Sequence, residues 1–485
     1  MPGPANFLVI MSDEHNPKVA GYARHPVVST PNLDRLAARG SVFESAYTTS
    51  PVCIPARAGF ACGKYIHQIG YWDNADAYDG AVPSWHHVLR DRGHRVVSIG
   101  KLHFRQAGED HGFSEEQIPM HIYEGRGDLM GLVRDELPRR GGSKKMAQMA
   151  GPGESPYTLY DKQICSRAQV WLREHGTRDT GKPWVLFVSF VAPHFPLTAP
   201  PEHFYKYWQR DLPMPKLYAR EHRPHHPYLE DYRGSFCYDD YFDSEESVRR
   251  AIAGYFGLVS YVDELIGKIL AVLQEAGLAG TTRVLYTSDH GDNLGARGLW
   301  GKSTMYEEIA GVPLIVAGPG IPEGRRIDTP VSHVDCFPTI LETAGVGFAE
   351  VQDGHPGVSL LELARGAQPE RTVLSEYHGM GSTTGAFAIR AGRYKYVHYV
   401  KYPPQLFDLE ADPEEIEDLA ARPEYARLLQ ECRARLHAVC DPEEVDRRAK
   451  RRQHELLAAH GGREEVIRRG DFGFTPAPGF PADFQ

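Results

Sequence analysis

The sequence predicts an α/β fold, in which a mostly parallel sheet is sandwiched by helices and a smaller α+β subdomain follows. Three observations support this prediction: short continuous apolar runs, helical patterns between them, and a change in the pattern of apolar and polar residues after about residue 370. Continuous apolar runs are typical of strands that are buried on both faces. Strands that alternate with helices indicate a largely parallel sheet with helices on both sides.

Five apolar runs are predicted to form the central strands. Each run is continuous, whereas a strand with one face in water would alternate between apolar and polar residues. The runs are FLVIM (7–11), RVVSIG (95–100), WVLFVSF (184–190), RVLYTS (283–288) and PLIVAG (313–318).

Two segments between these runs are predicted to be helices. In TPNLDRLAARG, Thr30 is the expected N-cap, Pro31 the first helical residue and Gly40 the C-terminal stop. In the stretch 247–276, apolar residues recur at the spacing of one helix face. These residues are Leu258, Val262, Leu265, Ile269, Val272 and Leu273.

The C-terminal part has a different pattern of apolar and polar residues. Residues 386–400 have β character, and EYARLLQECRARLHAV has the pattern of an amphipathic helix. We therefore expect three parts: an α/β domain at 1–370 that carries the functional site, an α+β subdomain at 371–470, and a Pro/Phe-rich tail at 471–485.

The tail, DFGFTPAPGFPADFQ, is too apolar for a free segment in water. Its prolines also reduce the entropy lost when an extended segment docks. Residues 104–160 and 196–245 have weak periodicity and are expected to be insertions at the mouth of a site. We expect the tail to pack on a protein surface near these insertions, on this chain or on a neighbouring subunit. The alternative is a disordered tail.

Composition excludes several classes of protein. The chain has 485 residues and a net charge of −10, which argues against a general binder of nucleic acid or of anionic membranes. No run of 18 apolar residues occurs, and the N-terminal run FLVIM is too short for a signal-peptide core, so a cytoplasmic protein is expected. The seven cysteines are scattered and form no CxxC pair, which favours neither a zinc knuckle nor a disulfide framework.

Two pairs of candidate metal ligands each follow a predicted strand. Asp13 and Glu14 come after the first strand, and Asp289 and His290 come after VLYTS. Ligands gather at the carboxyl ends of strands in an open parallel sheet, so the pairs could share one divalent cation. Carboxylates favour Ca²⁺ or Mg²⁺, and the imidazole leaves Mn²⁺ or Zn²⁺ open. The alternative is that both aspartates cap helices or form turns.

Basic side chains also follow the predicted strands. Lys101 and His103 come after one strand, His194 after the next, and Lys302 soon after Asp289. Such a group is suited to holding a small tetrahedral oxyanion. Taken singly, each residue has a simpler interpretation as a solvated lysine or a structural histidine.

Cys53 lies in a stiff segment, SPVCIPAR. Pro55 fixes its own φ and pushes Ile54 towards an extended conformation. Cationic neighbours such as Arg57 would make the Cys53 thiol acidic and so favour the nucleophilic thiolate. A structural cysteine is the alternative, and no Cys–His–Asn protease context surrounds it.

Together these segments resemble the formylglycine-dependent (type I) sulfatases, which have the alkaline-phosphatase-like fold. CIPAR matches the C-x-P-x-R maturation motif of that family. LVIMSDE, GKLHF, APHFP and TSDHGDNLGARGLWGK resemble further blocks in the family's order, and RYKYVHY with QLFDLEADPEEIEDLA resembles its C-terminal subdomain. The resemblance covers about residues 6–440 and is nearest to the choline-sulfatase-like branch.

The resemblance implies a role for each candidate residue. A formylglycine-generating maturation enzyme would oxidise Cys53 to formylglycine, whose hydrate attacks sulfur while Arg57 stabilises it. One divalent metal, Ca²⁺ first and otherwise Mn²⁺, Mg²⁺ or Zn²⁺, would be held by Asp13, Glu14, Cys53, Asp289 and His290. The sulfate would be bound by Asn74, Lys101, His194 and Lys302. Lys302 and His194 would protonate the leaving group, and His103 would take a proton as sulfate is expelled.

Three functions remain open at this point. The first is a sulfatase that acts on a small sulfate ester, without nucleic acid or membrane partners and as a homo-oligomer. The second is a phosphodiesterase or phosphonate monoester hydrolase on the same scaffold, although Lys101 and His103 stand where that branch has uncharged Tyr and Thr. The third is a non-catalytic binding protein, which has no reason to retain so many charged site residues.

Overall fold

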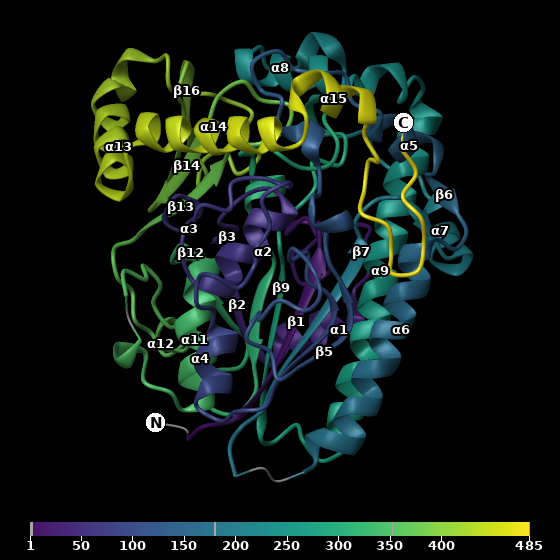
Figure 1. The fold of residues 1–485 in the computed structure, drawn as a ribbon, viewed down its shortest axis with the longest axis vertical. Helices are drawn as coiled ribbons and strands as arrows, with labels where there is room; N and C mark the ends of the chain where they lie inside the picture. Colours follow the sequence, from purple (N-terminus) through teal and green to yellow (C-terminus); the bar gives the residue numbers. More distant parts are fainter. Residues whose placement is uncertain (1–2, 179–180, 352, 485) are drawn as a thin grey trace.

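A sheet of eight strands forms the centre of the protein (Figure 1). The computed structural model describes residues 3–178, 181–351 and 353–484. In sheet order the strands are β11 (Arg325–Ile327), β2 (Gly40–Phe43), β10 (Leu314–Ala317), β9 (Thr282–Ser288), β1 (Asn6–Asp13), β7 (Val185–Pro193), β4 (Val96–Lys101) and β5 (Glu115–Met120). All five predicted runs are strands of this sheet.

Most neighbours in the sheet are parallel. Strand β1 pairs in parallel with β7 and β9, so that Ile10 lies beside Val188 on one side and Tyr286 on the other. Strand β10 is the exception, because it runs antiparallel to both β9 and β2. The parallel strands bring their carboxyl ends to one edge of the sheet, where the candidate residues were predicted to meet.

Helices cover both faces of the sheet, as predicted. Along β1, Leu8 and Ile10 pack into one hydrophobic core, while Phe7 and Val9 pack into another on the opposite face. The first core includes residues of α1 (Pro31–Ala38), α6 (Pro156–Trp171) and α9 (Glu245–Glu275). The second includes residues of α2 (Cys53–Cys62), α4 (Trp85–Asp91), α11 (Cys336–Ala344) and α12 (Leu360–Ala364).

The ends of α1 differ from the prediction. Thr30 occupies the N-cap position, but its hydroxyl donates to Asp34 and accepts no helix N–H. The free N–H groups of the first turn instead donate to the Asp263 carboxylate on α9, at 2.8 Å from the Leu33 nitrogen. Gly40 does not stop the helix, which ends at Ala38; it begins β2. A Cβ there would lie 2.4 Å from the Val316 carbonyl oxygen, so the close approach of β10 requires glycine.

The C-terminal subdomain is built on a second sheet, which is antiparallel throughout. Its strands are β13 (Thr372–Tyr377), β14 (Ala386–Ala391), β15 (Tyr394–Tyr399) and β16 (Tyr402–Asp408). Helix α13 (Ala426–Val439), predicted from its amphipathic pattern, packs Cys432 and Leu436 against the sheet. Helices α14 (Pro442–Ala459) and α15 (Gly462–Arg469) then run across the top of the molecule in Figure 1. The subdomain confirms the predicted α+β part; its exact limits stay a prediction.

The two insertions contain short elements and 3₁₀ turns. Apart from β5 and the start of α6, the first insertion contributes α5 (Gly142–Gln148) and β6 (Gly151–Pro152). The second contributes β8 (Thr198–Ala199), α7 (Pro201–Trp208) and α8 (Pro227–Phe236). The remaining short elements are β3 (Ala46–Tyr47), α3 (Ile66–Ile69), α10 (Glu307–Ala310) and β12 (Val331–Ser332). Within the described ranges, none of the helices combines the length and hydropathy that a bilayer span requires.

The tail folds back onto the first insertion of its own chain, beside α5 (Figure 1). Phe472 is 8% exposed, and its ring lies 5.8 Å from that of Tyr123. Phe474 packs edge to face on Tyr157, whose hydroxyl donates to the Thr475 carbonyl. The tail therefore packs on a protein surface near the insertions, and that surface belongs to the same chain.

Replacing Phe472 by alanine should lower the free energy of unfolding by about 2–4 kcal/mol, because the substitution leaves a cavity under the tail. Phe480→Ala is the matched control, since that ring is 45% exposed and should cost little. Urea denaturation of both variants measures the difference. Equal stabilities would show that the tail contributes nothing to the fold.

Candidate active site

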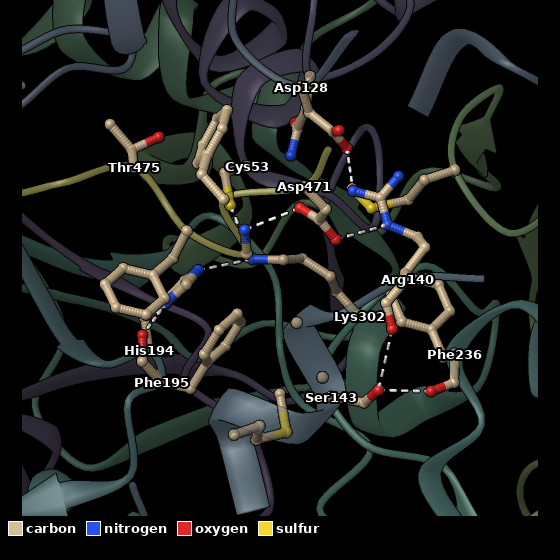
Figure 2. Close-up of a pocket in the computed structure, with 18 of the residues that line it drawn as sticks. Cys53, Asp128, Arg140, Ser143, His194, Phe195, Phe236, Lys302, Asp471 and Thr475 are labelled. Atoms are coloured by element: carbon tan, nitrogen blue, oxygen red, sulfur yellow. Dashed lines mark hydrogen bonds and ion pairs between the residues drawn. The ribbon is translucent and has the colours of Figure 1, made fainter. Parts of the chain in front are cut away.

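The predicted site residues meet at the carboxyl edge of the central sheet. Asp13 is the last residue of β1 and Lys101 is the last residue of β4, while His194 follows β7 and Asp289 follows β9. Cys53 begins α2, directly above this edge. Figure 2 shows the Lys302 side chain reaching between His194 and Cys53.

The Cys53 thiol is buried among charged groups. Its Sγ lies 3.0 Å from Lys302 Nζ, 3.2 Å from His290 Nε2 and 3.9 Å from Asp13 Oδ1. Burial, and next the Asp13 charge, raise the pKa of Cys53 to about 12 although Lys302 lowers it. This shift argues against the nucleophilic thiolate that the sequence left open.

Arg57 lies one helical turn after Cys53 and forms hydrogen bonds with buried groups from several strands of the sheet. Its Nε donates to Asp289 at 2.8 Å and its Nη2 to Asp13 at 2.9 Å. Its Nη1 donates to the Lys101 carbonyl and the Ser189 hydroxyl, at 2.9 and 2.8 Å. One guanidinium thus links α2 to the last residues of β1 and β4, to the middle of β7 and to Asp289 after β9.

Four potential metal ligands converge beside Cys53. One ligand atom from each of Asp13, Cys53, Asp289 and His290 lies within 4.8 Å of the others, and all four residues are buried. Burial, followed by the Asp13 charge, raises the pKa of Asp289 despite the neighbouring Arg57. A divalent cation between the two carboxylates would relieve this repulsion, so the residues present fit a metal.

Glu14 extends this group of ligands. Its carboxylate lies 3.3 Å from both Lys302 Nζ and His194 Nε2 through Oε2, while Oε1 is buried without a hydrogen-bond partner among the described residues. Burial raises the pKa of Glu14 to about 8, and Asp292 adds to the effect while Lys302 opposes it. A bound cation would satisfy the free oxygen, so Glu14 also fits a metal ligand.

Lys302 and His194 form a proton-carrying pair. Lys302 Nζ lies 2.8 Å from His194 Nε2. Burial, and next Lys302, lower the pKa of His194 well below its ordinary value. Burial alone would lower the pKa of Lys302, but Cys53, Glu14 and Asp13 raise it well above the usual value. The ammonium is therefore the donor and the neutral imidazole the acceptor.

Lys101 and His103 approach the site from the end of β4. Lys101 Nζ contacts Asp13 Oδ2 at 2.6 Å. His103 lines the pocket in a left-handed backbone conformation with φ of 55°, and neither ring nitrogen has a hydrogen-bond partner in the described ranges. Burial, and next the Lys101 charge, lower the pKa of His103 well below its ordinary value. A buried neutral imidazole without a partner is free to bind a ligand.

Asn74 supports the residue after the cysteine. Its Oδ1 accepts a hydrogen bond from the Ile54 nitrogen at 3.2 Å, and the side chain lines the same pocket. The structure thus brings every predicted site residue to one place. Arg57, expected to stabilise the modified cysteine, donates hydrogen bonds to Asp289, Asp13, Ser189 and the Lys101 carbonyl in this structure.

Sequence reasoning missed the outer wall of the pocket. The cavity over Cys53 encloses about 70 Å³. Arg140 contacts two carboxylates there, Asp128 at 2.8 Å and Asp471 of the tail at 3.3 Å. The wall also has an apolar part formed by Met146, Phe195, Tyr232, Phe236, Tyr238, Met380, Phe472 and Phe474. The sequence signal for it was the apolar tail, because most of the other residues come from the two insertions, while Phe195 follows His194 and Met380 belongs to the C-terminal subdomain.

Comparison with known proteins places the chain in a family. The family model described as sulfatase matches residues 5–346, and the model described as N-sulphoglucosamine sulphohydrolase, C-terminal, matches 295–441. The choline-sulfatase of Rhizobium meliloti (strain 1021) is 35% identical over 433 residues, which cover 87% of this chain and 83% of that protein. Arylsulfatase K of Homo sapiens is 27% identical over 462 residues, covering 90% and 82%.

Solved structures have the same fold. The phosphonate monoester hydrolase of Agrobacterium radiobacter superposes with a TM-score of 0.73 at 23% identity, covering 90% of this chain and 95% of that one. A protein in complex with its substrate D-glucosamine-2-N,6-O-disulfate superposes with a TM-score of 0.72 at 23% identity, covering 91% and 99%. With the sequence matches, these findings confirm the predicted resemblance: the chain belongs to the type I sulfatases of the alkaline-phosphatase-like superfamily, in the choline-sulfatase-like branch, and is a sulfuric ester hydrolase.

Proposed function

We propose that this enzyme hydrolyses a small sulfate monoester by means of a formylglycine made from Cys53 and one divalent metal. The observation that carries the proposal is the position of Cys53, at the start of α2 and within 3.9 Å of Lys302, His290 and Asp13. Formylglycine would supply a hydroxyl nucleophile, and the metal would supply positive charge that acidifies it and neutralises the sulfonyl oxygens.

The buried carboxylates and imidazole beside residue 53 would hold the metal. Its ligands would be Asp13, Glu14, Asp289, His290 and the modified side chain of residue 53. Hard oxygen ligands make Ca²⁺ the first candidate, and the imidazole keeps Mn²⁺, Mg²⁺ and Zn²⁺ as alternatives. Arg57 would act as a positioning residue, since its hydrogen bonds fix both aspartates.

The basic residues of the site, with Asn74, would bind sulfate and transfer protons. Lys101, Lys302, His194 and Asn74 would hold the sulfonyl oxygens. The Lys302 ammonium, which lies 2.8 Å from His194 Nε2, would protonate the leaving group together with that histidine. His103, with both ring nitrogens free of partners among the described residues, would accept the proton released as sulfate departs.

The pocket favours a small leaving group. The cavity over Cys53 has a volume of about 70 Å³ and an aromatic wall, which supports a small leaving group. The name of the choline-sulfatase relative makes choline sulfate one member of the panel to test.

Three further proposals concern the protein in the cell. A formylglycine-generating enzyme would be its maturation partner, and the active form would be a homo-oligomer. A cytoplasmic location is the third proposal, and the free thiols of the six cysteines other than Cys53 support it, since disulfides are rare in reducing compartments.

Cys53→Ala should lower kcat by at least about 10³-fold, because the nucleophile is lost. In active wild-type protein, mass spectrometry should find the Cys53 peptide lighter by the difference between CH₂SH and CHO. Cys62→Ala, which removes a buried thiol of the same helix, is the control and should keep its activity. Full turnover by Cys53→Ala would exclude the formylglycine mechanism.

Removal of the metal should lower kcat by about 10³-fold, because acidification of the nucleophile and neutralisation of charge are lost together. Asp289→Asn should act similarly while keeping a group that can face Arg57. Chelation, then addition of Ca²⁺, Mn²⁺, Mg²⁺ or Zn²⁺ singly, identifies the ion that restores the rate. An unchanged rate in protein shown by elemental analysis to be metal-free would refute the proposal.

The second candidate activity is phosphodiester or phosphonate monoester hydrolysis, favoured by the fold shared with a phosphonate monoester hydrolase. Both kinds of ester carry one negative charge, so the metal does not discriminate between them. We expect kcat/KM for 4-nitrophenyl sulfate to exceed that for a matched phosphodiester by at least about tenfold, or 1.4 kcal/mol. Lys101→Ala should lower the sulfate value more than the diester value. A tenfold preference for the diester would make the second candidate the correct one.

A further inference from the structure

A second group of metal-type ligands lies far from Cys53 in the chain, at the junction of α13 and α14. His437 is in the last turn of α13, Asp441 is the N-cap of α14, and Glu443 is in its first turn. One ligand atom from each lies within 4.8 Å of the other two. None of these residues touches the sulfatase site described above, so the group needs a separate explanation.

His398 approaches the same point from β15 beneath the junction. It is 8% exposed, and its Nε2 makes no hydrogen bond to any described residue. This nitrogen lies 3.4 Å from Glu443 Oε1, and the ring centre is 6.5 Å from that of His437. The other ring nitrogen, Nδ1, contacts the Tyr396 hydroxyl at 3.3 Å. A buried imidazole with one nitrogen engaged and the other aimed at a carboxylate has the arrangement of a metal ligand with its outer support.

His398 approaches the converging group of His437, Asp441 and Glu443 at Glu443, and that one distance fits a small four-coordinate ion. Ligand atoms about 2.0–2.2 Å from a tetrahedral zinc lie roughly 3.3–3.6 Å from one another, which matches the 3.4 Å between His398 and Glu443. Asp441 uses Oδ1 to accept the N–H groups of Glu443 and Glu444, at 3.1 and 3.2 Å, so its position is fixed while Oδ2 remains available. Arg433 is the nearby positive charge that opposes a cation at this point.

The donor set selects the class of metal. Two imidazoles and two carboxylates suit Zn²⁺ or a similar first-row ion, whereas Ca²⁺ takes six to eight oxygen ligands. We propose that His398, His437, Asp441 and Glu443 form a second metal site, which binds Zn²⁺ and ties the α13–α14 junction to β15. Bound metal would stabilise the C-terminal subdomain and take no part in sulfate ester hydrolysis.

The test compares zinc binding by three full-length proteins. The site variant is His437→Ala with Glu443→Gln, which removes two ligands from the surface and leaves the buried His398 in place. The control is His454→Ala with Glu455→Gln, which makes similar changes at exposed positions of α14. All three proteins keep the Cys53 centre, so a difference in stoichiometry reports the second site whether or not the catalytic metal proposal holds.

Calorimetric titration with Zn²⁺ in excess Ca²⁺ should give wild type and control one more equivalent than the site variant. That equivalent should be lost or weakened by at least roughly 10–100-fold in the site variant. Zn²⁺ should raise the Tm of wild type and control only, and hydrolysis of a sulfate ester should be equal in all three proteins. Equal stoichiometry and affinity in wild type and site variant, or an equal Tm shift, would overturn the proposal.

Discussion

The site depends on one buried interaction, the contact of the Arg57 guanidinium with Asp13 and Asp289. Both carboxylates are fully buried, and two such charges side by side would be costly without a cation between them. Arg57 offsets that cost with hydrogen bonds to both. It can do so only because β1 and β9 are adjacent and parallel, which brings their final residues to the same level. The order of the strands is thus a condition for the chemistry.

The position of Cys53 follows from this contact. Residues 53 and 57 are one turn apart on α2, so fixing the guanidinium beneath the sheet edge also fixes the thiol above it. At that point the sulfur is buried and close to Asp13, and both effects raise the pKa of the thiol. A thiol whose pKa is raised is a poor nucleophile, so the position of Cys53 argues against direct attack by the unmodified side chain. The burial that suppresses the thiolate would strengthen the pull of Lys302 and Lys101 on a sulfonyl oxygen.

Much of this arrangement could be predicted from the sequence, because it depends on local patterns. Five apolar runs gave the strands of the main sheet, and residues placed directly after them met at one edge. The prediction for Gly40 was wrong because a glycine after a helix has two explanations, a left-handed cap or a close backbone contact, and only tertiary structure decides between them. Arg57 was predicted as a site residue, yet its partners could not be, since they depend on the strand order.

The outer wall of the pocket could be predicted even less well from the sequence. Asp128, Arg140 and Asp471 come from two regions more than 300 positions apart, and nothing near any of them in the chain indicates the others. Their contacts hold the tail in place, and the tail in turn presents Phe472 and Phe474 to the cavity. An aromatic wall beside Lys302 and His194 lowers the local polarity, which would strengthen their interaction with a bound anion. Residues of the tail therefore line the same cavity as Cys53, and the contacts that shape this outer wall belong to no sequence motif.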